Sequence, residues 1–454
     1  DGTEPEPLPD LNAGTTLILN KANAFTCPRE VRPRFGRLIE RSEDSFRSGP
    51  ELLNSLKELE VDRLVFFNPY ASKKRLALYR AVRKAGFPYL VAERGALRDS
   101  LFFDPHGFNA DSKSYDPKYW DKPISDEAAR EVEGFAKAEL QSSRSLEEQG
   151  DRLGVDGLRQ ALSIPLEKKI LFVPLQRPSD TVMEFMAKSV GGASGFNDLL
   201  RHVHSQLPHD WVMLVKKHPL ETDRPNLPDD VFVPDDTHVN DLLQLSSAVL
   251  AVNSGVGVLA LLANLPMMYA GECFYGHKGL NSHVKTADCV VSFLKSPNKP
   301  DPTKRLRFLA YLIFEFYSFG TMKTRRVRWH DGSWMTATTQ IDLYQMRGIG
   351  RTANYGVGTQ RISLESPLFD RYRNDLNDQE RKNRAGYREA PRHGGGSERS
   401  GVTQGMRRVQ RQLKDARFMP DPLYQGLNAA GKLAHHVLTK RSMFTPELLR
   451  ELMK

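Results

Sequence analysis

The residues of this sequence that could do chemistry are polar and charged groups that directly follow apolar runs. Asp180 comes after the run 169–174, and Glu93 after the run 89–92. Open α/β sheets bind ligands at the carboxyl ends of their strands, so both carboxylates are site candidates. Paired carboxylates can serve as a nucleophile and a general acid/base. The plainer alternatives are a helix N-cap for Asp180 and a solvated turn for Glu93.

Cations gather after a third apolar run, 211–215. Lys216, Lys217 and His218 precede Pro219, which holds the histidine backbone extended and directs the imidazole away from the strand end. Such groups suit a phosphate through charge-assisted hydrogen bonds. Taken alone, a His-Pro pair is more often a basic surface turn, so the interpretation depends on the strands beside it.

A tight polar turn, 253–257, separates an expected buried strand from an expected helix. The Ser254 hydroxyl and the backbone N–H groups from Gly255 onward predict an anion site. The turn also matches a dinucleotide fingerprint, with Gly257 and Ala260 in the later places, but that fingerprint belongs in the first strand–helix turn of its domain. A NAD site is therefore disfavoured, and a purely structural turn stays open.

The elements that must position these residues alternate along the chain. Strands are expected at 16–19, 63–67, 89–92, 169–174, 211–215, 231–233, 248–252 and 266–270, and helices at 52–59, 73–84, 125–149, 196–206, 256–263 and 305–319. Such alternation predicts right-handed strand–helix–strand units and parallel sheets. The predicted fold class is therefore α/β, with two Rossmann-like halves facing a central cleft. The candidate donor residues lie in the second half, so the donor site is expected wholly there.

Four parts are expected. They are an acceptor domain at 1–160, a nucleotide-sugar-binding domain at 161–300, helices packing back on the core at 301–345, and a basic, partly flexible extension at 346–454. Within the extension, residues 371–417 carry 13 Lys and Arg against 6 Asp and Glu, a net charge of +7 out of +9 for the chain. This favours anionic partners.

Composition excludes several classes of protein. The 454 residues are 39% hydrophobic, enough for real cores, and the three cysteines lack Cys-x-x-Cys spacing. A disulfide framework and a cysteine zinc site are therefore disfavoured, and a reducing compartment, the cytoplasm, is expected. The uncharged stretch 242–271 is long enough to span a membrane, but interrupting Ser, Asn and Pro residues favour the strand–turn–helix interpretation. No signal peptide is visible in the first residues.

Five blocks resemble the bacterial β-Kdo glycosyltransferases of capsule and O-antigen (lipopolysaccharide) biosynthesis, a Kps-type family. The resemblance covers about residues 20–319, with the blocks at 93–98, 173–180, 216–219, 253–262 and 270–280. It implies a GT-B fold in a Gram-negative bacterium, CMP-Kdo as the donor, and retaining transfer to a glycan or lipid-linked saccharide acceptor. It implies no cofactor or metal. Lysines and helix N–H groups can neutralise CMP.

The resemblance also implies residue roles. Asp180 matches the nucleophile and Glu93 the candidate acid/base. Donor binding is expected from Gln176, Arg177, Lys216, His218, Ser254, Gly255, Tyr275 and Lys278, and the acceptor side from Asn68 and Arg98. Family members carry an acidic stretch where this chain has 177–179, and an aromatic residue where Lys278 stands. These departures leave the acceptor and the subfamily open.

Three other functions fit parts of this pattern. A sialyl- or glycerophosphate-type transferase with a CMP- or CDP-linked donor would use the same His-Pro and Ser-Gly elements. A non-catalytic polysaccharide-binding or export protein would make the carboxylates incidental. Nucleic-acid binding through the basic extension has no recognition motif behind it and is not expected. The extension is instead expected near the anionic inner membrane surface, beside a lipid-linked acceptor.

Overall fold

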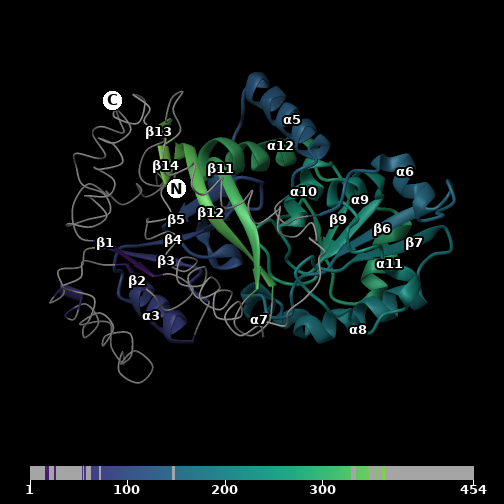
Figure 1. The fold of residues 1–454 in the computed structure, drawn as a ribbon, viewed down its shortest axis with the longest axis horizontal. Helices are drawn as coiled ribbons and strands as arrows, with labels where there is room; N and C mark the ends of the chain where they lie inside the picture. The colour runs from purple at the N-terminus through teal and green to yellow at the C-terminus, as the bar shows by residue number, and fades with distance from the viewer. Residues whose placement is uncertain are drawn as a thin grey trace, which may run out of the picture.

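A computed structural model describes residues 63–70, 73–145 and 149–320 (Figure 1). It also describes the shorter segments 16–19, 25–26, 54, 56–57, 321–328, 334–346, 353–354 and 360–362. Of the helix expected at 52–59, residues 54, 56 and 57 are described and helical. Most of the basic extension expected at 346–454 lies outside the described residues.

The first sheet begins as a parallel α/β unit, as predicted. Strand β3 (Arg63–Phe67) lies between β1 (Thr16–Leu19) and β4 (Tyr89–Arg94), parallel to both. Helix α3 (Lys73–Lys84) connects β3 to β4 with the bounds expected from the sequence. On its other edge, β1 pairs antiparallel with β2 (Phe25–Thr26). The carboxyl ends of β3 and β4 thereby meet at one edge.

Beyond β4 the first sheet becomes antiparallel, which the sequence analysis did not predict. Its order across the described strands is β13-β12-β11-β5-β4-β3-β1-β2, with β14 paired to β12. The added strands are β5 (Ser100–Asp104), β11 (Tyr317–Arg328), β12 (Trp334–Met346), β13 (Ala353–Asn354) and β14 (Gln360–Ile362). All five residues of β5 are buried.

The helix expected at 305–319 therefore ends early, and the expectation of helices throughout 301–345 is wrong. Helix α12 (Pro302–Ala310) is capped by the Asp301 side chain and continues as a π-helix to Phe316. Tyr317 then pairs with Phe102 of β5, and their rings stack 6.3 Å apart. This tertiary contact turns the chain into a strand despite its helical spacing.

The second sheet is entirely parallel, in the order β10-β9-β8-β6-β7. Its strands are β6 (Lys169–Pro174), β7 (Trp211–Lys216), β8 (Ala248–Ala251), β9 (Met267–Tyr269) and β10 (Ser282–His283). Four of these confirm predicted strands to within a residue at each end. The strand expected at 231–233 is wrong, because Asp229–Val231 forms a 3-10 helix and Phe232 makes a single bridge to Val215.

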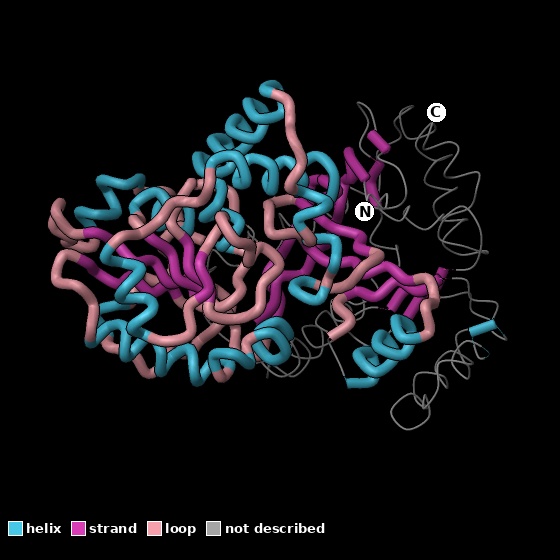
Figure 2. Tube along the Cα trace, turned by 180° about the vertical axis from the view of Figure 1, so that it is seen from behind, coloured by secondary structure: helices cyan, strands magenta, loops and turns pink. Residues whose placement is uncertain are grey.

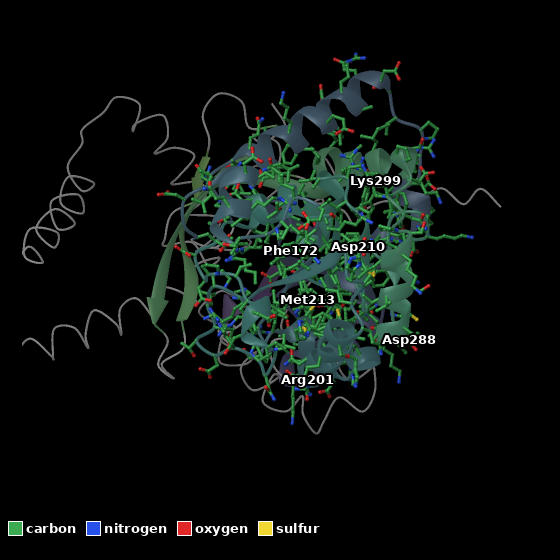
Figure 3. The ribbon with its side chains drawn as sticks, turned by 90° about the vertical axis from the view of Figure 1, so that its right-hand side faces the viewer. Phe172, Arg201, Asp210, Met213, Asp288 and Lys299 are labelled. Atoms are coloured by element: carbon green, nitrogen blue, oxygen red, sulfur yellow. The ribbon has the colours of Figure 1, made fainter. Side chains whose placement is uncertain are left out.

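Both faces of the second sheet are covered, which explains its nearly continuous apolar strands. Along β6, Ile170 and Phe172 enter one core, and Leu171 and Val173 enter the other. Helices α8 (Gly192–Ser205) and α11 (Ala287–Lys295) cover the second core, and α9 (Val239–Leu245) and α10 (Val256–Leu262) the first. Figure 3 shows Phe172 and Met213 inside this half, with Arg201 and Asp288 at its periphery.

Helices join the two sheets, which form separate groups of strands in Figure 2. The chain passes from the first to the second through α4 (Pro117–Trp120), α5 (Asp126–Gln141) and α6 (Gly154–Ala161). Buried Arg305 of α12 pairs with Glu133 of α5 and donates to the last carbonyls of α10, at Leu261 and Leu262. No helix within the described ranges combines the length and apolarity that a membrane crossing requires.

Candidate active site at the junction of the two sheets

Asn68 is the point where the two halves meet beside both candidate carboxylates. It follows β3 in the left-handed region (φ 48°), which asparagine tolerates better than most residues. Its backbone N–H donates to the carbonyl of Ala92, next to Glu93. Its side-chain Nδ2 donates to Thr181 Oγ1 at 3.0 Å, next to Asp180. Asn68 therefore bonds to the residue before Glu93 and to the residue after Asp180.

Asp180 begins helix α7 (Thr181–Met186), which lies between the two sheets in Figure 1. Its backbone takes the N-cap position, but its side chain does not cap the helix. The N-cap alternative is therefore confirmed for the position of Asp180, but not for a capping bond from its carboxylate. The helix also contacts the first half through Phe185, whose ring lies 5.2 Å from that of Tyr70. The Asp180 residue thus lies at the start of α7, and its role as the nucleophile stays a prediction.

Glu93 lies within β4 rather than after it, because the strand extends to Arg94. It pairs across the sheet with Phe102, and its Oε1 accepts from the backbone N–H of Arg94 at 3.1 Å. The block 93–98 is thus the end of β4 and the turn into antiparallel β5. Gly95 fits there because a Cβ would lie 2.1 Å from Ser100 Oγ.

The turn that carries Ser254 is held from behind by Tyr275. The Tyr275 hydroxyl donates to the Ser254 carbonyl at 2.7 Å, and the ring lies where a Cβ on Gly257 would fall, 2.3 Å from Cζ. Tyr275 is 0% exposed, so it supports the turn rather than contacting a donor directly. This corrects its expected role in donor contact.

The first N–H groups of α10 are already used inside the chain. Val256 donates to Ser254 Oγ, Gly257 to the Ser254 carbonyl, and Val258 to the Gly255 carbonyl. Three amides of the expected anion site are thus engaged within the turn, while the Ser254 hydroxyl keeps its proton for donation. The anion site itself stays a prediction. The turn also touches the first half, because a Cβ on Gly255 would lie 3.3 Å from Ala96 Cβ.

The His218 ring accepts a hydrogen bond at one of its two nitrogens. Its Nδ1 accepts from the backbone N–H of Leu220 at 3.1 Å, so the neutral ring carries its proton on Nε2. Burial, together with the charges of Arg177, Arg94 and Lys216, lowers the pKa of His218 to about 4. Three cations around one imidazole make the surroundings electropositive, which suits an anionic ligand.

The cations near His218 are held in different ways. Arg177 Nε pairs with Glu221 Oε1 at 2.6 Å, partly exposed. Lys216 is buried and its Nζ donates to the Asp235 carbonyl, and burial lowers its pKa to about 8. Lys216 therefore contributes charge rather than the direct contact that was expected. Lys217 Nζ likewise donates to the Glu221 carbonyl.

Three further predicted residues have structural partners or lie elsewhere. Gln176 exchanges two hydrogen bonds with Asn253, at 2.9 and 3.2 Å. Arg98 pairs with Glu139 of α5 and with Asp99, both in the first half, and its place on the acceptor side stays a prediction. Lys278 is exposed, and its carbonyl accepts from Lys304.

Within the part of the chain that the structure describes, no group of three or more His, Cys, Asp or Glu residues converges to hold a metal ion.

Sequence reasoning missed three residues of this junction: Arg94, Thr181 and Asn253. Each stands beside a predicted residue, namely Glu93, Asp180 and Ser254. This position next to a predicted residue was the signal that could have indicated each of them. Their roles depend on contacts between segments far apart in the chain, which spacing does not show.

Comparison with known proteins gives a family match and distant structural neighbours. Residues 127–317 match the family model described as capsule polysaccharide biosynthesis protein. No curated protein sequence matches the chain. Among solved structures, the chain is similar to two Thermosulfurimonas dismutans KpsC domains. The β-Kdo 2,4 transferase is 18% identical, covering 57% of this chain and 82% of that one, with a TM-score of 0.43. The β-Kdo 2,7 transferase is 17% identical, covering 66% and 92%, with a TM-score of 0.41.

Proposed function

We propose that this chain is a GT-B glycosyltransferase that transfers Kdo from CMP-β-Kdo to a polysaccharide or glycolipid acceptor, with retention. The proposal starts from the family, because residues 127–317 belong to the capsule polysaccharide biosynthesis family. The observation that carries the proposal is the junction itself. Asn68 bonds beside both Glu93 and Asp180, and His218 lies among cations from both halves. Two carboxylates and an anion site at one junction suit a sugar transferase.

The donor would bind through its phosphate and carboxylate. His218 Nε2–H and the Ser254 hydroxyl donate to the phosphate of CMP, while Arg177 and Arg94 balance the negative charge of phosphate and sugar acid. A CMP leaving group departs as a phosphate anion. His218 therefore stabilises it without giving up a proton, which fits an imidazole that stays neutral near pH 7.

The chemistry then follows as two displacements. The Asp180 carboxylate attacks the anomeric carbon, a carbon–oxygen bond to Asp180 forms, and the bond to the CMP oxygen breaks. Glu93 next takes the proton of the acceptor hydroxyl, whose oxygen attacks the same carbon and releases Asp180. Two inversions give net retention.

The experiment is mass spectrometry of protein and product after incubation with CMP-Kdo and candidate acceptor glycans. Asp180→Asn is expected to bind CMP but to lose turnover by several orders of magnitude. Glu93→Gln is expected to accumulate one sugar on Asp180, because the acceptor is no longer deprotonated.

The matched control is Glu184→Gln, an exposed carboxylate on the same helix α7, which is expected to keep wild-type turnover. Parallel incubations use a CMP-linked sialic acid and a CDP-linked glycerol. Turnover of one of these instead of CMP-Kdo would move the assignment to that donor. Unchanged turnover in both Asp180→Asn and Glu93→Gln would remove the double displacement.

A further inference from the structure

Asn253 connects the donor side of the junction to the helix that starts at Asp180. Its side chain is buried, with 2% of the residue exposed. Nδ2 donates to the carbonyls of Val182 and Met186, both at 3.1 Å, near the two ends of α7. Oδ1 accepts from Gln176 Nε2 at 2.9 Å. One amide therefore joins the end of β6, helix α7 and the Ser254 turn.

Helix α7 needs such support because it is short. Its six residues are too few to form a stable helix alone, and the Asp180 side chain does not cap it. The contacts from Asn68 and Tyr70 belong to the other half and would shift with any movement between the halves. Asn253 belongs to the same half as both Asp180 and Ser254, so it can fix their separation independently of that movement.

We propose that Asn253 is a positioning residue that sets the place of the Asp180 carboxylate relative to a donor phosphate bound at Ser254. The inference deepens the proposed function and rests on it. Nucleophilic attack needs the reacting atoms at near-contact distance, and a displacement of about 1 Å can cost on the order of 100-fold in rate. Phosphate binding uses other groups, at His218 and Ser254. Loss of the Asn253 amide should therefore slow bond formation while leaving CMP affinity nearly unchanged.

The sharpest variant is Asn253→Asp. It keeps the size and the Oδ1 acceptor for Gln176, but it replaces the Nδ2 donor by an oxygen facing two carbonyls. The expected result is a loss of kcat of about 100-fold, with the CMP dissociation constant within about threefold of wild type. Asn253→Ser, smaller and uncharged, is the second variant, and a smaller loss of kcat is expected from it. It carries the test alone if Asn253→Asp does not fold.

The matched control is Asn240→Asp. Asn240 is also buried, at 3% exposure, and its Nδ2 also donates to two carbonyls, those of Glu139 and Ser142, at 2.9 and 3.1 Å. It joins α9 to the end of α5, and both acceptors of its Nδ2 lie away from α7 and the Ser254 turn in the chain. Its substitution should lower thermal stability to a similar degree but leave kcat within a few fold of wild type.

Measurements are kcat, CMP binding by calorimetry, and hydrogen exchange of the α7 amides with and without CMP. A drop in kcat confined to the Asn253 variants, with faster α7 exchange, supports the inference. Equal kcat in Asn253→Ser and Asn240→Asp would overturn it. If wild-type protein binds CMP but transfers no sugar, the proposed function fails. In that case the inference still requires that CMP slow hydrogen exchange of the α7 amides in the wild type and in Asn240→Asp, but not in the Asn253 variants.

Discussion

At the scale of single residues, the junction combines groups that are individually ordinary. His218 stays neutral because it is buried near the positive charges of Arg177, Arg94 and Lys216. Its proton lies on Nε2 because Nδ1 accepts from the Leu220 N–H. A neutral donor does not need to lose a proton to release a phosphate, so its protonation state and its proposed task agree. The same burial links the protein's stability to pH.

Acid should destabilise the protein partly through His218. Its pKa is about 4 in the native state, against about 6.5 unfolded. Between these values the unfolded state binds a proton that the native state does not, so the free energy of unfolding falls as pH drops from 6.5 towards 4. From pH 7.5 to 4.5 this amounts to about 2 to 3 kcal/mol. His218→Asn keeps an acceptor for the Leu220 N–H and cannot titrate, so it should lose less stability over this interval. Urea unfolding of both proteins at the two pH values measures the difference, and parallel losses would contradict it.

Arg94 should affect donor binding although it belongs to the first half. Its charge lowers the pKa of His218, so it acts on the same electrostatic site. Arg94→Gln is expected to weaken CMP binding several-fold and to raise the pKa of His218. Calorimetry gives the affinity, and NMR titration of the imidazole gives the pKa. Arg98→Gln, whose guanidinium pairs with Glu139, serves as the control and should change neither quantity. If Arg94→Gln leaves both quantities unchanged, the donor site belongs to the second half alone.

At the scale of elements, α7 and α10 carry the two parts of the proposed site, and neither is stable in isolation. Each is held by side chains from elsewhere: Asn253 on α7, Tyr275 under the start of α10, and Arg305 at its end. Tertiary contacts rather than helix propensity therefore set their positions.

Gly257 and Gly134 offer a paired test at this scale. In Gly257→Ala the new methyl would overlap the buried Tyr275 ring, so the ring must move and its bond to Ser254 must lengthen. The free energy of unfolding is expected to fall by about 1 to 3 kcal/mol. CMP is expected to stabilise this variant less than it stabilises the wild type. Gly134 lies within α5, and a Cβ added there would meet open space. Gly134→Ala should therefore stabilise the protein by about 0.5 to 1 kcal/mol. Thermal unfolding with and without CMP tests both, and equal effects at the two positions would contradict the packing argument.

The positions of single strands and helices could be predicted from the sequence better than which of them pack or pair with one another. Parallel strands such as β6 and β7 are short, buried apolar runs, and these can be recognised without a fold. Strand β5 was missed because its five buried residues sit beside a turn of polar residues, and β11 because its aromatic spacing also fits a helix. At the site, Asp180, Glu93, His218 and Ser254 could be chosen as candidates because each ends or closely follows a predicted strand. The hydrogen bonds of Asn68 and Asn253 could not, since each depends on pairing segments more than 60 residues apart.

At the scale of the whole molecule, charge is distributed very unevenly along the chain. Residues 371–417 hold +7 of the net +9. We propose that this basic segment attracts the protein to an anionic membrane surface that carries the acceptor.

Deleting residues 371–417 should reduce co-sedimentation with vesicles that contain anionic lipid. Each Lys or Arg near such a surface contributes about 1 kcal/mol, and the attraction weakens with salt. Turnover on a soluble acceptor should persist, because the proposed catalytic residues lie outside the segment. Vesicles of neutral lipid provide the control. Equal sedimentation of both proteins on anionic vesicles would rule out this role.

The return of β11 to the first sheet also has a consequence for synthesis on the ribosome. Ala96 donates its N–H to the Tyr317 hydroxyl, although 221 residues separate them, and the parallel sheet of the second half lies entirely between them in the chain. At translation rates of about 5 to 20 residues per second, β5 emerges roughly 10 to 40 s before its neighbour β11. The second half, continuous in sequence, can complete its sheet during that delay, while the apolar edge of β5 stays unpaired and prone to association. The nascent chain is therefore most vulnerable in its oldest part, and that vulnerability ends only when β11 arrives.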